Sequence, residues 1–259
     1  MKILAIDTAT EACSVALLDT AALLEGALLL DSTSRLNQAS LGAQQNDDIY
    51  QGVDSIFEIC PQQHSQQILP MIDKLLVRNS CKLSDLDAIA YGRGPGSFTG
   101  VRIAASTVQG LAFGANLPVV QVSTLAAMAR QVYAQTGIEE HLVLIDARMK
   151  EVYMGHFKVI NGVAIEQIEE SVVSPEDALC YLESLPTGIG LAGTGYITYA
   201  ETFAQTLQSF ALEVHYPSAA FMLPSAIYAM DQGTSIAVEE INPIYVRDKV
   251  TWQKLPHKR

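Results

Sequence analysis

The sequence predicts an α/β protein in which one structural unit occurs twice. Apolar, strand-like segments alternate with segments whose apolar residues recur at helical spacing. The order of three strands, a helix, a strand and a helix is found in both halves of the chain, without repetition of the sequence itself. At 259 residues, of which 49% are hydrophobic and 17% charged, the chain is long and apolar enough to bury the cores of two modest units.

The first unit is expected to span residues 1–115. Its strands follow from short apolar runs and its helices from a period of about 3.6 residues. Strands are expected at Ile3–Asp7, Cys13–Leu18, Ser55–Cys60 and Leu86–Tyr91, and helices at Ser65–Arg78 and Val101–Phe113. Residues 19–52 mix small and polar residues with a few leucines, so we expect an exposed insertion there.

The second unit is expected to span residues 116–242. Strands are expected at Val119–Val122, His141–Asp146, Glu151–Val159, Val163–Glu169, Ile189–Ala192 and Leu212–Tyr216, and helices at Leu125–Gln135, Pro175–Leu185 and Tyr199–Gln208. This element order is typical of RNase H-like units, which occur in duplicate in the actin/Hsp70/sugar-kinase (ASKHA) superfamily. The last segment, residues 243–259, has room to pack back on the first unit.

The charge distribution argues against RNA binding by most of the chain. The formal net charge is −12, and no Lys or Arg occurs between Val159 and Val246. Because nucleic-acid affinity depends on cations that meet phosphates, this region should repel RNA. The tail from Arg247 to Arg259 is basic and could touch RNA, although a solvated terminus is the simpler interpretation. We therefore expect the chain by itself to bind RNA negligibly.

Membrane attachment and secretion are not indicated. No apolar run reaches the length of a membrane span, and strand-like sequence begins at Ile3 with no secretion signal before it. The four cysteines are scattered without a C-x-x-C pair, which favours buried thiols over a disulfide framework or a metal site. These features predict a cytoplasmic protein.

A glycine-rich loop is the most distinctive segment of the chain. It follows the strand that ends at Tyr91 and precedes a helix for which Thr99 is a candidate N-cap. Its residues are Gly92, Arg93, Gly94, Pro95, Gly96 and Ser97. A strand, a glycine loop and a helix N-terminus can bind anions, but the spacing fits neither G-x-x-x-x-G-K-[ST] nor G-x-G-x-x-G. Spacing alone therefore favours a tight strand-to-helix connection.

The turn after the first strand resembles half of a phosphate site. Asp7, Thr8 and Thr10 supply the carboxylate and hydroxyls that ASKHA kinases place near metal and phosphate. The corresponding segment of the second unit, Asp146–Glu151, has no glycine or hydroxyl residue and puts bulky side chains where phosphate needs bare N–H groups. We interpret the first turn as a vestigial phosphate turn; the alternative is a simple turn-capping carboxylate at Asp7. No cofactor is expected for the chain by itself.

Other catalytic patterns are missing from the sequence. The five histidines never occur at the i, i+4 spacing of a helical metal site, and there is no G-x-S-x-G nucleophile elbow. We therefore assign no catalytic and no metal-binding residue. An ATPase or kinase, or a peptidase, stays open as the alternative class of function.

The two helices of the first unit carry more apolar surface than one sheet needs to cover. Close packing on a partner would explain this excess, whereas coverage by the rest of the same chain is the alternative. The expected partner interface consists of Ile68, Leu69, Met71, Ile72, Leu75, Leu76, Val101, Arg102, Ala105 and Gln109.

Five segments in order along the chain resemble the TsaB (YeaZ) family of bacterial tRNA-modification proteins. These segments are Ile3–Thr10, Gly92–Arg102, Val122–Leu125, Ile145–Tyr153 and Tyr245–Arg247. The resemblance covers nearly the whole chain except residues 19–52, where the family has a short hairpin turn.

The resemblance implies a non-catalytic subunit of the machinery that forms N6-threonylcarbamoyladenosine in tRNA. In that family the helix pair of the first unit binds the catalytic subunit TsaD, or a second copy of the chain, and the complex recruits the ATPase TsaE. TsaD holds its metal through a paired-histidine motif, which this sequence lacks.

Overall fold

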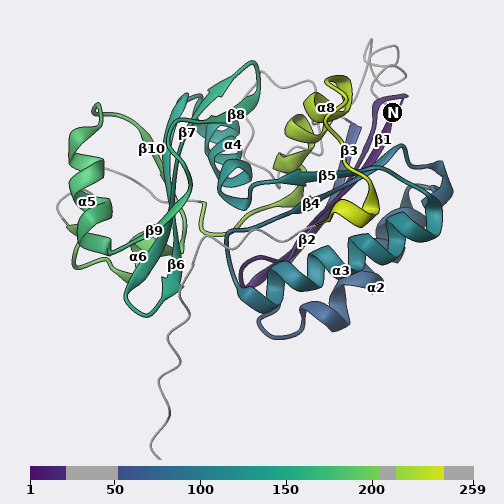
Figure 1. Cartoon of the computed structure of the whole chain (residues 1–259), viewed down its shortest axis with the longest axis horizontal. Coiled ribbons are helices and arrows are strands. Elements are labelled where there is room, and N and C mark those ends of the chain that lie inside the picture. The colour runs from purple at the N-terminus through teal and green to yellow at the C-terminus, as the bar shows by residue number, and fades with distance from the viewer. Residues whose placement is uncertain (22–51, 205–213, 242–259) are drawn as a thin grey trace, which may run out of the picture.

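The computed structural model describes residues 1–21, 52–204 and 214–241 of the chain. Over these residues the strands form two sheets that lie next to each other, and helices cover both faces of each sheet (Figure 1). The predicted α/β fold class is therefore confirmed. Within the same residues, no helix is long and apolar enough to cross a lipid bilayer.

The first sheet has the strand order β3-β2-β1-β4-β5, which is the RNase H-like order. Strands β1, β2 and β3 are antiparallel, whereas β4 and β5 run parallel to β1. The strands are β1 (Lys2–Asp7), β2 (Ala12–Asp19), β3 (Val53–Ile59), β4 (Ala88–Gly92) and β5 (Val119–Val122).

Alternate residues of β1 enter two different cores, because successive side chains of a strand point to opposite faces. Leu4 and Ile6 belong to the core that helices α2 (His64–Arg78) and α3 (Phe98–Ala115) cover. Ile3 and Ala5 belong to the core on the opposite face, which includes the 3-10 helix η3 (Ala219–Met222) and helix α8 (Leu223–Asp231). Two further 3-10 helices are η2 (Leu83–Asp85) and η4 (Val238–Glu240).

The second sheet repeats most of the first. Its order is β10-β6-β7-β8, with β9 also paired to β7, and it matches the order β4-β1-β2-β3 in strand directions. The strands are β6 (Glu140–Arg148), β7 (Glu151–Ile160), β8 (Val163–Glu166), β9 (Ser171–Val173) and β10 (Gly190–Ala192). Helix α4 (Thr124–Thr136) covers one face, and α5 (Pro175–Ser184) and α6 (Thr194–Thr198) cover the other.

Several elements differ from the sequence-based expectation. Strand β5 hydrogen-bonds to β4 in the first sheet, although the sequence placed it at the start of the second unit. The division into two units stays a proposal, and this pairing favours a boundary after Val122. Strand β9, η3 and α8 were not predicted, and α6 precedes the expected helix at 199–208. Most of the insertion at 19–52 and all of the segment 243–259 lie outside the described residues.

Candidate functional site

Asp7, at the end of β1, is completely buried, and its carboxylate accepts two hydrogen bonds. Its Oδ1 accepts the Ala9 N–H at 2.9 Å, and its Oδ2 accepts the Thr124 hydroxyl, at the start of α4, at 3.0 Å. Burial raises the pKa of Asp7 to about 6, and the two hydrogen bonds oppose that rise. Asp7 therefore caps its own turn and ties it to α4.

The two hydroxyls of the vestigial phosphate turn also have partners inside the chain. The Thr8 hydroxyl donates to the Gly100 carbonyl at 2.7 Å. The Thr10 hydroxyl accepts the Ala12 N–H at 3.3 Å. The groups that would have to meet a phosphate are thus engaged in local contacts, which favours the turn-capping interpretation of this segment.

The glycines of the loop let its backbone press against this turn. A Cβ added to Gly92 would lie 1.9 Å from Asp7 Oδ2, and one added to Gly100 would lie 2.0 Å from the Thr8 carbonyl oxygen. Ser97 N–H also donates to the Ala9 carbonyl at 2.7 Å. The loop is therefore a tight strand-to-helix connection, as its spacing predicted, and the close backbone approach explains its glycines.

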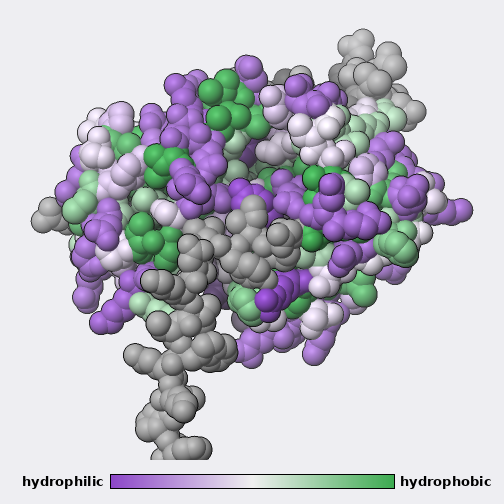
Figure 2. All heavy atoms as spheres, in the orientation of Figure 1, coloured by the Kyte–Doolittle hydropathy of each residue, from purple (hydrophilic) through white to green (hydrophobic). Residues whose placement is uncertain are grey.

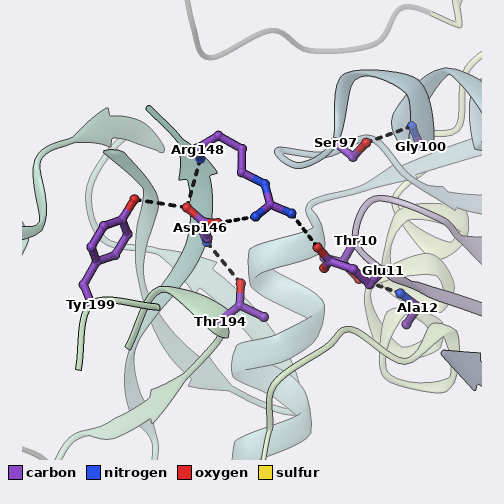
Figure 3. Close-up of polar contacts among 9 residues, drawn as sticks. All are labelled: Thr10, Glu11, Ala12, Ser97, Gly100, Asp146, Arg148, Thr194 and Tyr199. Atoms are coloured by element: carbon purple, nitrogen blue, oxygen red, sulfur yellow. Dashed lines mark hydrogen bonds and ion pairs between the residues drawn. The ribbon is translucent and has the colours of Figure 1, made fainter. Parts of the chain in front are cut away.

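Helix α3 begins three residues earlier than expected, at Phe98 rather than Val101. Its N-cap is Ser97, whose Oγ accepts the Gly100 N–H at 3.3 Å (Figure 3), so the expectation of an N-cap at Thr99 was wrong. Gly100, which donates to this cap, is also the residue whose backbone packs closely against the Thr8 carbonyl. The N-terminus of α3 is thus fixed both by its cap and by the vestigial phosphate turn.

Arg93 connects the glycine loop to the second sheet. Its guanidinium lies 3.2 Å from Glu170 Oε2, just before β9, and the side chain of Glu170 is only 5% exposed. The Ser123 hydroxyl donates to the other oxygen of Glu170, and Ser123 Oγ in turn accepts the Ala126 N–H at 3.1 Å to cap α4. Burial raises the pKa of Glu170, and Arg93 opposes that rise.

Arg148 connects the corresponding turn of the second sheet to the first. Its Nη2 lies 2.9 Å from Glu11 Oε1, and its Nη1 lies 3.0 Å from Asp146 Oδ2 (Figure 3). Asp146 also accepts the Tyr199 hydroxyl at 3.2 Å, and its N–H donates to the Thr194 hydroxyl at 3.1 Å. Charged and bulky side chains thus fill this turn, as the sequence predicted.

The backbone of that turn is also unlike a phosphate loop. Arg148, Met149 and Lys150 all have left-handed φ angles, of 62°, 55° and 62°, without a glycine among them. Among the described residues, no group of three His, Cys, Asp or Glu side chains could hold a metal ion. The Arg148–Glu11 ion pair therefore joins this turn to the turn of the first sheet.

The expected partner interface divides into a buried part and an exposed part. Ile68, Met71, Ile72, Leu75 and Ala105 lie in the core between the helices and the first sheet, and Leu76 packs half-buried against it. Val101 is buried as well, and each of these residues except Leu76 is at most 5% exposed. The first sheet thus covers six of these residues within the chain itself, which corresponds to the alternative interpretation of the apolar arc. A role in a partner interface stays a prediction. Leu69, Arg102 and Gln109 are exposed.

The structure adds two exposed apolar residues that the sequence analysis missed, Phe98 and Phe113, beside the predicted Leu69. Phe98 and Phe113 of α3 are 54% and 73% exposed, and Leu69 of α2 is 54% exposed. The Arg102 guanidinium stacks on the Phe98 ring at 3.5 Å, and a Cβ added to Gly110 would meet open space. We call Leu69, Phe98, Arg102, Gln109, Gly110 and Phe113 the exposed α2–α3 face. Phe98, Arg102, Gln109 and Phe113 recur at helical spacing along α3, and this spacing in the sequence could have identified Phe98 and Phe113 as part of the same face.

Grooves run along both sides of α3 on this face. One lies against α2 and includes Leu69, Phe98 and Arg102; the other lies against η4 and includes Gly110, Phe113 and Val238. On the side of the molecule shown in Figure 2, hydrophobic residues form separate patches between hydrophilic ones. The grooves and exposed rings together make a surface that a partner helix could cover.

Comparisons with known proteins agree with this architecture. Residues 44–213 match the family model described as TsaD, tRNA N6-adenosine threonylcarbamoyltransferase. The "tRNA threonylcarbamoyladenosine biosynthesis protein TsaB" of Escherichia coli K12 is 40% identical, with all of both chains covered. The protein of that name from Haemophilus influenzae is 38% identical, with 99% of this chain and 98% of the relative covered. The solved structure "YeaZ from Pseudomonas aeruginosa" is 35% identical with a TM-score of 0.71, covering 95% of this chain and all of the other.

Proposed function

The chain belongs to the TsaB family and takes part in tRNA threonylcarbamoyladenosine biosynthesis, and we propose that it does so as a non-catalytic subunit. The observation that carries this proposal is that the polar side chains of both turns bind other groups of the same chain. Asp7, Thr8 and Thr10 have partners within the chain, and Arg148 links Glu11 to Asp146. Since every one of these groups already has a structural task, the chain's contribution to the pathway is to bind and hold other subunits.

We propose that the exposed α2–α3 face binds the transferase TsaD. Phe98, Phe113 and Leu69 are each more than half exposed, and apolar side chains that gather along one face, beside grooves, mark an interaction site. Covering a fully exposed large side chain contributes about 1.5–3 kcal/mol, and these three are already partly covered, so a stable complex would also need contacts along the two grooves. Gly110 would let a partner helix approach the α3 backbone closely.

The same face would serve for a homodimer when TsaD is absent, because both partners would cover the same apolar side chains. We further propose that the complex with TsaD recruits the ATPase TsaE and carries the tRNA contacts. The long stretch without Lys or Arg, from 159 to 246, supports placing tRNA away from the second unit.

Reconstitution tests this function directly. The chain alone should not modify tRNA, whereas its addition to TsaD, TsaE and the threonylcarbamoyl donor should raise the rate of modification. The mass of the mixture with TsaD, measured by light scattering, should equal that of a heteromeric complex. Threonylcarbamoyl transfer by the chain alone would refute the non-catalytic role.

A further inference from the structure

The two grooves beside α3 carry opposite charges. Arg102, in the second turn of α3, lines the groove against α2, and Glu239 of η4 lines the groove beside the C-terminal half of α3, together with Gly110. Ser106 lines both grooves, so the two adjoin each other along the helix. At 1.5 Å per residue, the levels of Arg102 and Gly110 are about 12 Å apart along the axis of α3.

The Arg102 side chain is exposed and yet held in place. Its guanidinium stacks on the Phe98 ring, with the central carbon 3.5 Å from the ring centroid. A stacked guanidinium presents its N–H donors at the edge of its plane, in the fork that matches a carboxylate. Because stacking already orients this group, less side-chain freedom is lost when a carboxylate binds it.

The stability of α3 does not account for the positions of these charges. The helix dipole favours anions near the N-terminus and cations near the C-terminus. α3 has no acidic residue in its first turn and no basic residue in its last turn. Instead, Arg102 lies in the N-terminal part of the helix and Glu239 lies beside its C-terminal half, so both charges add to the dipole. The surface is therefore polarised along α3.

A partner helix that covers α3 has to match this polarity. A charge that loses its water in an interface needs an opposite charge as partner, because otherwise its desolvation is not compensated. A helix with the matching charges is attracted in one direction, whereas the reversed helix brings like charges together. The two charges thus distinguish between the two directions in which a helix can lie along α3.

We propose that Arg102 and Glu239 determine the direction in which a helix of TsaD lies on α3: that helix carries an acidic side chain against Arg102 and, about two turns away, a basic side chain against Glu239. This inference rests on the proposed function of the exposed α2–α3 face and gives that face its charge specificity. The two charges set the rate of association and the orientation, and the apolar side chains supply most of the affinity.

Rates of TsaD binding to full-length variants test the proposal. Arg102→Glu and Glu239→Lys each reverse one charge, and Arg102→Lys keeps the charge without the planar fork. Lys158→Glu and Glu183→Lys are the matched controls, because they make the same changes of net charge at exposed positions of β7 and α5. Association and dissociation rates are measured at low and at high salt, and circular dichroism confirms that each variant is folded.

We expect Arg102→Glu and Glu239→Lys each to slow association with TsaD by about tenfold at low salt, and by less at high salt, where exposed charges are screened. Arg102→Lys should stay within about threefold of the parent, because steering depends on the charge. The two controls should change the rate by less than about twofold.

The double variant Arg102→Glu/Glu239→Lys separates local charge from net charge. It has the net charge of the parent but the reversed polarity along α3, so it should bind TsaD more slowly than either single variant. Recovery of the parent rate in the double variant would show that only the net charge matters and would overturn the proposal.

Two further results would overturn the charge specificity. One is a parent-like rate and salt dependence in both single reversals; the other is an Arg102→Lys variant as slow as Arg102→Glu, which would assign Arg102 a packing role on Phe98. In either case, loss of the complex in Leu69→Glu would still support the docking face. A normal complex of Leu69→Glu would instead overturn the docking face itself, so the two failures are distinguishable.

Discussion

Arg148 of the second sheet reaches across to Glu11 in the β1–β2 turn of the first, with 2.9 Å between Nη2 and Oε1. The same guanidinium contacts Asp146 at 3.0 Å, so one side chain joins the two turns that the fold places opposite each other. The Arg148 side chain is 73% exposed, and such pairs contribute about 1 kcal/mol or less to stability. The contact therefore joins the two turns while adding little to the stability of the chain.

Nucleotide binding should be absent in the isolated chain. Titration of the chain with ATP and Mg²⁺ in a calorimeter should give no binding heat. Arg148→Ala should not create a site, because Asp7, Thr8 and Thr10 keep their internal partners. Magnesium-dependent binding in the micromolar range would instead support the ATPase or kinase alternative.

Asp7→Asn should stabilise the protein at neutral pH. Burial raises the pKa of Asp7 from 3.8 to about 6, so the folded state binds more protons than the unfolded state between these values. Stability contributed by the protonated acid is therefore lost as pH rises from about 4 to about 6, by up to about 3 kcal/mol. Asparagine keeps the shape of the side chain and cannot ionise.

Urea denaturation at pH 4 and pH 7 measures this effect as a difference between the two proteins. Asp7→Asn should match the parent at pH 4 and exceed it at pH 7 by about 1–3 kcal/mol. The buried His141, whose pKa is lowered to about 4 by burial, gives the opposite slope, but it is present in both proteins and cancels. A variant that is less stable at pH 7 than the parent would contradict this account. tRNA modification by the complex should stay within several-fold of normal.

Two glycines of the same helix should respond in opposite ways to alanine. Gly100→Ala places a Cβ 2.0 Å from the Thr8 carbonyl, so it should destabilise the chain by about 1–3 kcal/mol. Gly110→Ala meets open space and should stabilise the helix by about 0.5–1 kcal/mol. Thermal unfolding of both variants checks this, and equal effects would refute the close approach at Gly100. Gly110→Ala should nevertheless weaken TsaD binding if a helix packs there.

The sequence was sufficient to predict most strands and helices, because their apolar patterns are local. Strands such as β1 and β4 are buried on both faces, and the resulting apolar runs are bounded by turns. The composition of the Asp146–Glu151 turn is also a local feature of the sequence. Its lack of glycine and hydroxyl residues predicted a turn filled by side chains, and the Arg148 side chain fills it.

The sequence could not separate the exposed residues of the helix pair from its core residues. Ile68 and Leu69 are neighbours with the same chemistry, yet they are 1% and 54% exposed, because the rotation of α2 on the sheet decides which one is covered. Likewise, no local pattern connects Arg93 with Glu170, or assigns β5 to the first sheet. These contacts depend on how the two sheets are placed, which only the tertiary structure defines.

The central claim is that the exposed α2–α3 face binds TsaD, and Leu69→Glu tests it most directly. Because Leu69 is 54% exposed, the variant should fold normally, but a charge without a partner in a dry interface should abolish the complex. Ile165→Glu is the matched control, since Ile165 is 40% exposed on β8 of the second sheet. In light scattering of mixtures with TsaD, the parent and Ile165→Glu should form the complex and Leu69→Glu should not; a complex of Leu69→Glu as tight as that of Ile165→Glu would contradict the claim.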